Sequence, residues 1–130
     1  MGFFSKKVKK IRVYKTKNFE KFADKERISD ESLRNAVDEI GAGLVEAELG
    51  GNVFKKRLAI EGRGKRGGAR SIVAYKASER CFFILGFAKS NKGNLSSGDL
   101  KILKGFSKKM LNYDENDINN AIKTKEIKEI

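Results

Sequence analysis

Three strand-like runs follow one another in the middle of the chain, and they limit its possible folds more than any other feature. They occupy residues 53–60, 70–77 and 81–89. The last two are joined by the tight connection Ser78-Glu79-Arg80, which favours an antiparallel meander. Residues 81–87 are apolar at nearly every position, which is typical of a strand covered on both faces.

Apolar residues at helical spacing flank these strands on both sides. We expect one helix around residues 19–23, one capped by Ser29, one opened by the capping box Ser96-x-x-Asp99, and one from about residue 114 onwards. Their apolar positions are Phe19, Phe22 and Ala23; Leu33, Val37 and Ile40; Leu100, Leu103, Phe106 and Met110; and Ile118, Ile122 and Ile127.

A short strand at residues 11–14 completes the expected order: strand, two helices, three strands, then helices. This order predicts an α+β fold, with a small antiparallel sheet, N-terminal helices packed on it, and C-terminal helices. The 130 residues suit one domain, 1–130, with its core at about 10–112 and its C-terminal helix at about 114–130.

The net charge of +12 is unevenly distributed along the chain. Residues 51–110 carry fifteen Lys or Arg against three acids, and residues 1–17 carry seven cations and no acid. Residues 18–50 are acidic instead, with nine acids against four cations. A field concentrated in one block of the chain favours a polyanionic partner over generic solubilising lysines.

The residue inventory excludes several classes of site. There is no His, and the single cysteine, Cys81, can form no disulfide within the chain. The usual zinc and iron–sulfur sites are therefore excluded, and we expect neither metal nor cofactor. The sequence contains no long apolar core of a signal peptide and no membrane-length apolar run, so we expect a cytoplasmic protein.

Residues 61–70, EGRGKRGGAR, hold four glycines and four cations, and contain the pattern G-x-G-x-x-G. A dinucleotide loop needs a helix after the glycines, whereas a strand pattern follows here; the P-loop form also fails, because Gly68 follows Gly67. Two interpretations remain open: a mobile hairpin tip with solvated charges, or a phosphate cradle. The cradle is favoured by cations at the ends of three successive strands, which we predict to bind RNA: Lys55 and Arg57, then Arg63 in the loop, and Lys92 beyond the third strand.

The segments Lys55-Lys56-Arg57-Leu58-Ala59, G-K-R-G-G-A-R at 64–70, Gly86-Phe87-Ala88-Lys89 and Asn94-Leu95-Ser96 resemble the RelE/HigB superfamily of bacterial toxins, best its HigB-like branch. The resemblance covers about residues 10–112. It implies helices packed on an antiparallel sheet, metal-independent cleavage of mRNA on the ribosome, and neutralisation by a cognate helix-turn-helix antitoxin.

The resemblance also implies the catalytic positions. Arg70 takes the place of a phosphate-stabilising arginine, Lys65 and Arg66 take the cationic loop positions, and Lys89 takes the basic position after the last strand. Because the chain lacks His, proton transfer would fall to a lysine whose pKa is lowered by its neighbours. Glu61, the one acid near the loop, could act as a base, but a role in orienting an arginine is favoured. Some family members carry a tyrosine where this chain has Leu95.

Two other functions remain open from the sequence. One is a gyrase-inhibiting toxin of the ParE branch, which shares the fold and acts by binding protein. The other is a non-catalytic basic RNA-binding domain. Residues 18–50 or the C-terminal helix would offer the antitoxin a docking surface, because both combine acids with apolar stripes.

Overall fold

The computed structural model describes residues 11–130 except 61–63, 78 and 89–95; for residues 64–67 it describes the backbone and not the side chains. Within this part of the chain, six strands form one sheet in the order β2-β3-β4-β5-β1-β6. The strands are β1 (Arg12–Thr16), β2 (Ala47–Gly50), β3 (Val53–Ile60), β4 (Gly64–Lys76), β5 (Arg80–Ala88) and β6 (Ile127–Glu129). The helices are α1 (Lys17–Glu26), α2 (Asp30–Gly41), α3 (Ser97–Leu111) and α4 (Glu115–Lys123).

The predicted meander is present: β3, β4 and β5 pair antiparallel in sequence order. The first strand joins it on the far side of β5, parallel to it, with Val13 opposite Cys81. The last strand, β6, pairs antiparallel with β1 and forms the edge of the sheet on that side. The fold is therefore α+β with a mostly antiparallel sheet, as expected.

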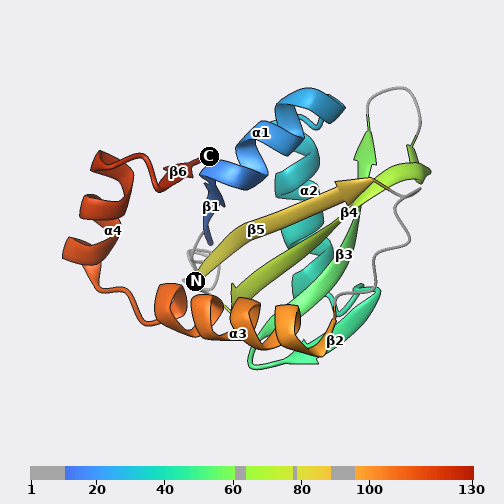
Figure 1. Ribbon diagram of the computed structural model, residues 1–130. Helices are drawn as coiled ribbons and strands as arrows, with labels where there is room; N and C mark the ends of the chain where they lie inside the picture. The colour runs from blue at the N-terminus through green and yellow to red at the C-terminus, as the bar shows by residue number, and fades with distance from the viewer. Residues whose placement is uncertain (1–10, 61–63, 78, 89–95) are drawn as a thin grey trace, which may run out of the picture.

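Helices cover both faces of the sheet (Figure 1). One core lies between the sheet and α1 and α2; it contains Phe19, Leu33, Val37, Leu58 and Phe83. The other lies between the sheet and α3 and α4; it contains Tyr14, Phe82, Ile84, Met110 and Ile118. Successive residues of β5 contribute side chains to both cores, which explains why apolar and polar residues do not alternate along this strand.

The helix starts follow the predicted caps. The Ser29 hydroxyl accepts a hydrogen bond from the backbone N–H of Ser32 at 3.1 Å, and Ser96 accepts from Asp99 at the same distance. These bonds satisfy backbone donors that have no partner within the helix. Leu95, which replaces the tyrosine of some family members, lies outside the described residues.

Gly86 sets how closely α1 approaches β5. A Cβ added there would lie within 2.8 Å of Phe22 Cγ, closer than carbon atoms can pack. The glycine lets the Phe22 ring lie against the strand, while the next residue, Phe87, is directed to the opposite face of the sheet.

Two predicted boundaries were wrong. The fourth strand begins at Gly64 rather than at residue 70, so Lys65 and Arg66 lie on a strand and not in a loop. Gly64 pairs with Ile60, which shows that the available edge of β3 outweighs the weak strand preference of glycine. At the C-terminus, α4 ends at Lys123 and Ile127 lies in β6, not in a helix. There the chain covers the otherwise open edge of β1.

In the described part of the chain, the longest helices are too short and too polar to cross a lipid bilayer.

Candidate functional site

Three of the predicted cations share one face of the sheet. Arg57 and Arg70 are directly opposite in the register of β3 and β4, so their side chains project to the same side. Ala74, four residues along β4 from Arg70, belongs to the core under α3 and α4, which identifies that side. Lys55 lies two residues before Arg57 and joins it there.

A carboxylate lies between the two arginines. Glu46 Oε2 is 3.5 Å from an Nη atom of Arg57, and its Oε1 is 3.2 Å from Nε of Arg70. The Arg70 Nε is buried, and this ion pair lacks the alignment of a hydrogen bond. Two arginines facing each other across a strand pair repel, so the charge of Glu46 offsets a local cost. We call these three residues the Glu46–Arg57–Arg70 cluster.

An aromatic ring borders the cluster. Phe87 on β5 is directly opposite Arg70 in the register, and the Lys55 ammonium lies 5.9 Å from the centroid of its ring. This distance fits a cation–π contact. The face therefore combines three cations, one carboxylate and a half-buried aromatic ring.

The position of Glu46 is set by a tight hairpin. Gly51 and Asn52 both have positive φ, of 64°, as a two-residue turn with the twist of the flanking strands requires. The turn brings Glu46 beside Lys55, whose carbonyl accepts the Glu46 N–H at 2.8 Å. We did not predict β2 or Glu46 from the sequence; the dipeptide Gly51-Asn52 just before an apolar run was the available signal.

A buried ion pair supports the same segment from the other face. The ammonium of Lys56 lies 2.8 Å from Glu39 Oε1 on α2 and donates to the carbonyl of Leu44 at 2.7 Å. The first contact joins β3 to α2. The second holds the chain two residues before Glu46, so Lys56 contributes to the geometry of the cluster without belonging to it.

The other predicted site residues are only partly described. Lys65 and Arg66 are among the first residues of β4, and the structure describes only their backbone. The remaining predicted residues, Arg63, Lys89, Lys92 and Glu61, lie outside the described residues. Of the eight predicted cations, the structure thus brings Lys55, Arg57 and Arg70 together.

Neither Tyr113 nor Tyr75 belongs to the Glu46–Arg57–Arg70 cluster. The Tyr113 hydroxyl donates to Glu126 Oε1 at 2.8 Å near α4, and burial raises the pKa of Tyr113 to about 12. Burial also raises the pKa of Tyr75 above its usual value. Neither hydroxyl is disposed to ionise near neutral pH. Among the described residues, no group of three His, Cys, Asp or Glu side chains could hold a metal ion.

The fold and its charged sheet face define a small basic α+β protein. The family model described as the RelE toxin of the RelE/RelB toxin–antitoxin system matches residues 11–130. The chain belongs to this family, and it is therefore the toxin of a toxin–antitoxin pair, with an antitoxin as partner. Its assignment to the HigB-like branch remains a prediction.

Proposed function

We propose that the protein is a metal-independent endoribonuclease that cleaves mRNA on the ribosome, in the cytoplasm. The observation that carries the proposal is the Glu46–Arg57–Arg70 cluster, a carboxylate between two guanidinium groups on an otherwise basic sheet face. Guanidinium groups bind phosphate oxygens through two parallel hydrogen bonds and retain their charge at any physiological pH.

Internal RNA cleavage needs a base for the 2′-hydroxyl, stabilisation of the negative charge on the phosphorane, and an acid for the leaving oxygen. The cluster supplies groups for the first two. Glu46 accepts the proton of the 2′-hydroxyl, whose oxygen then attacks the neighbouring phosphorus. Arg57 and Arg70 stabilise the negative charge that develops on the phosphorane oxygens. Without RNA, the same carboxylate offsets the repulsion between the arginines.

The third requirement is an acid that protonates the leaving oxygen. As the P–O5′ bond breaks, the 5′ oxygen takes a proton from an ammonium group, for which we propose Lys65 or Lys89. Arginine is excluded from this step because it does not give up its proton in proteins. The products are a 2′,3′-cyclic phosphate and a 5′-hydroxyl end, and the step needs no metal.

Replacing Arg70 tests the proposal. Arg70→Ala should abolish growth inhibition at equal expression, because it removes a guanidinium group that stabilises the negative charge of the transition state. Lys76→Ala is the matched control: it removes a cation from the other end of the same strand, where Lys76 pairs with Glu79 at the surface. Thermal unfolding of both variants checks the fold. A fully toxic Arg70→Ala variant would show that the assignment is wrong.

The reaction itself separates the remaining alternatives. After induction, protein synthesis should stop before DNA synthesis, and purified toxin should cut mRNA on translating ribosomes, leaving 2′,3′-cyclic phosphate and 5′-hydroxyl ends. Earlier arrest of DNA synthesis would indicate a ParE-like inhibitor. Binding to RNA without any cut would indicate a non-catalytic domain.

A further inference from the structure

A hollow lies on the same face of the molecule as the Glu46–Arg57–Arg70 cluster. It has a volume of about 350 Å³ and lies where β5, α3 and the start of α1 meet. Its apolar walls are Ile84, Leu85, Leu103 and Phe106, and its polar rim is Thr16, Lys17, Asn18 and Glu126. We call it the β5–α3 pocket.

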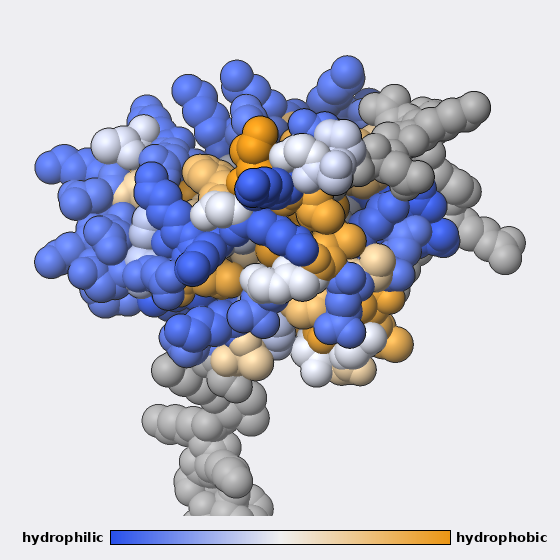
Figure 2. All heavy atoms as spheres, turned by 60° about the horizontal axis from the view of Figure 1, so that its bottom comes forward, coloured by the Kyte–Doolittle hydropathy of each residue, from blue (hydrophilic) through white to orange (hydrophobic). Residues whose placement is uncertain are grey.

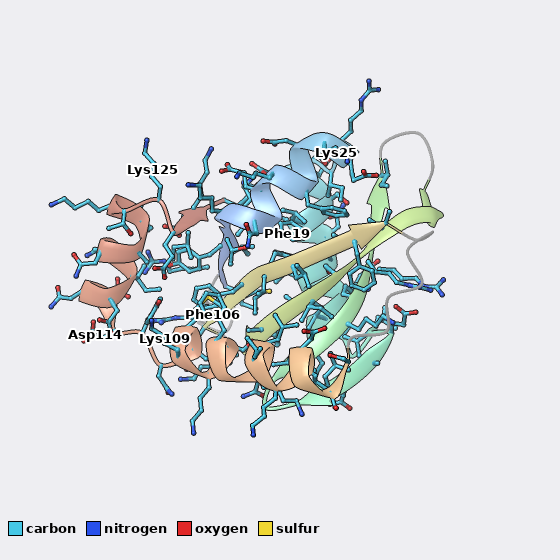
Figure 3. The ribbon with its side chains drawn as sticks, viewed as in Figure 1. Phe19, Lys25, Phe106, Lys109, Asp114 and Lys125 are labelled. Carbon is cyan, nitrogen blue, oxygen red and sulfur yellow. The ribbon has the colours of Figure 1, made fainter. Side chains whose placement is uncertain are left out.

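The pocket retains exposed apolar surface that the core does not use. Phe106 is 36% exposed and extends from α3 towards β5 (Figure 3). Ile102, one turn earlier on α3 and outside the pocket lining, is 73% exposed. Figure 2 shows apolar side chains gathered near the centre of this face, with hydrophilic residues on both sides. These side chains leave apolar surface accessible to a ligand on this face.

The pocket continues from the cluster along one strand. Phe87 on β5 is opposite Arg70. Leu85, two residues before Phe87 and on the same face of β5, lines the pocket. Two residues of strand span about 7 Å. One chain that placed a phosphate against the arginines would therefore reach the pocket with a neighbouring group.

The rim carries hydrogen-bonding groups that an apolar protein anchor would not use. The Thr16 hydroxyl is already engaged: it donates to the Ile84 carbonyl and accepts the Phe19 N–H. Glu126 retains one carboxylate oxygen beyond the bond from Tyr113. Within the described residues, the Asn18 amide makes no hydrogen bond and is left for a ligand.

We propose that the β5–α3 pocket binds one nucleobase of the single-stranded RNA substrate. This inference rests on the proposed function. Apolar walls accept the face of any base, and Phe106 offers the aromatic surface on which bases stack. Asn18 and Glu126 belong to the pocket lining, where their amide and carboxylate groups would meet the edge of the base. A carboxylate accepts from exocyclic amino groups, which adenine, cytosine and guanine carry and uracil lacks.

The basic residues of α3 fit this occupant. Lys101, Lys104, Lys108 and Lys109 lie on the helix that forms one wall, against one acid, Asp99. Their positive field attracts the phosphate backbone of an RNA chain bound near this helix. An acidic protein segment would also be attracted by these lysines, and the experiment separates the two occupants.

The test measures binding of octamers rA8, rC8 and rU8, and of an abasic octamer with the same phosphates, to the purified full chain. Phe106→Ala should weaken binding of rA8 by about 5- to 150-fold, the range that base–aromatic stacking spans, and leave binding of the abasic octamer unchanged. Ile102→Ala is the matched control on the same helix, because Ile102 is more exposed and does not line the pocket. rU8 should bind more weakly than rA8 and rC8.

The outcomes are distinguishable from failure of the proposed function. If Arg70→Ala abolishes cleavage and toxicity but Phe106→Ala binds rA8 as the unmodified protein does, the pocket inference is wrong and the nuclease stands. If Phe106→Ala weakens only the antitoxin complex, the pocket is a protein-docking surface and the inference is again wrong. Equal loss for rA8 and the abasic octamer would also overturn it, because the base would contribute nothing.

Discussion

Replacing Glu39 by glutamine should destabilise the fold, because it leaves the buried ammonium of Lys56 without a counter-charge. The Lys56 side chain is 6% exposed and lies 2.8 Å from Glu39 Oε1. Its one other polar contact in the described structure is the carbonyl of Leu44. Glutamine keeps the shape and helix preference of glutamate, so the change isolates the charge.

The expected loss follows from the burial of the pair. Removing one partner of a fully buried ion pair costs about 3–5 kcal/mol. Glu39 is 27% exposed, and the glutamine oxygen can still accept a hydrogen bond, so we expect about 2 kcal/mol. At about 2.1 cal/mol/K per residue, a 130-residue chain has an unfolding entropy of about 0.27 kcal/mol/K. The melting temperature should therefore fall by about 7 °C.

Thermal and urea unfolding followed by circular dichroism measure this loss. Glu79→Gln is the matched control: it breaks the exposed pair with Lys76, at 3.4 Å, and should cost less than about 0.5 kcal/mol. The double variant Glu39→Gln/Lys56→Met should recover at least half of the loss, because no buried charge remains. If Glu39→Gln costs no more than the control, or the double variant is less stable than the single, the reasoning is wrong.

Three further variants and one solution condition give outcomes that the structure predicts. Tyr14→Phe should stabilise the protein by about 1 kcal/mol in urea unfolding, because the buried Tyr14 hydroxyl has no hydrogen-bond partner among the described residues. Tyr113→Phe, which loses the bond to Glu126, should instead cost about 0.5–1 kcal/mol; a larger loss at Tyr14 than at Tyr113 would contradict this. RNA binding should weaken by on the order of 10²- to 10³-fold between 50 and 200 mM salt for about six phosphate contacts, and Lys55→Ala should make this dependence shallower. A salt-insensitive interaction would point to an apolar protein target.

The elements that the sequence predicted are those whose signals are local. Ser29 and Ser96 cap helices because a hydroxyl placed just before a helix satisfies N–H groups a few residues away. The register of β3 follows from the alternation of Leu58 and Ile60 with Lys55 and Arg57. These patterns determined the α+β class, the meander and the shared face of two cations before any tertiary contact was known.

Tertiary structure alone decided what lies beside them. Glu46 comes from a separate acidic stretch, and only the hairpin at Gly51-Asn52 brings its carboxylate between Arg57 and Arg70. Ile127 fits a helical stripe in sequence, yet it joins β6 because β1 offers an unpaired strand edge. Pairing partners and ion pairs depend on which backbone edges and charges meet in space, and a periodicity along the chain does not contain that information.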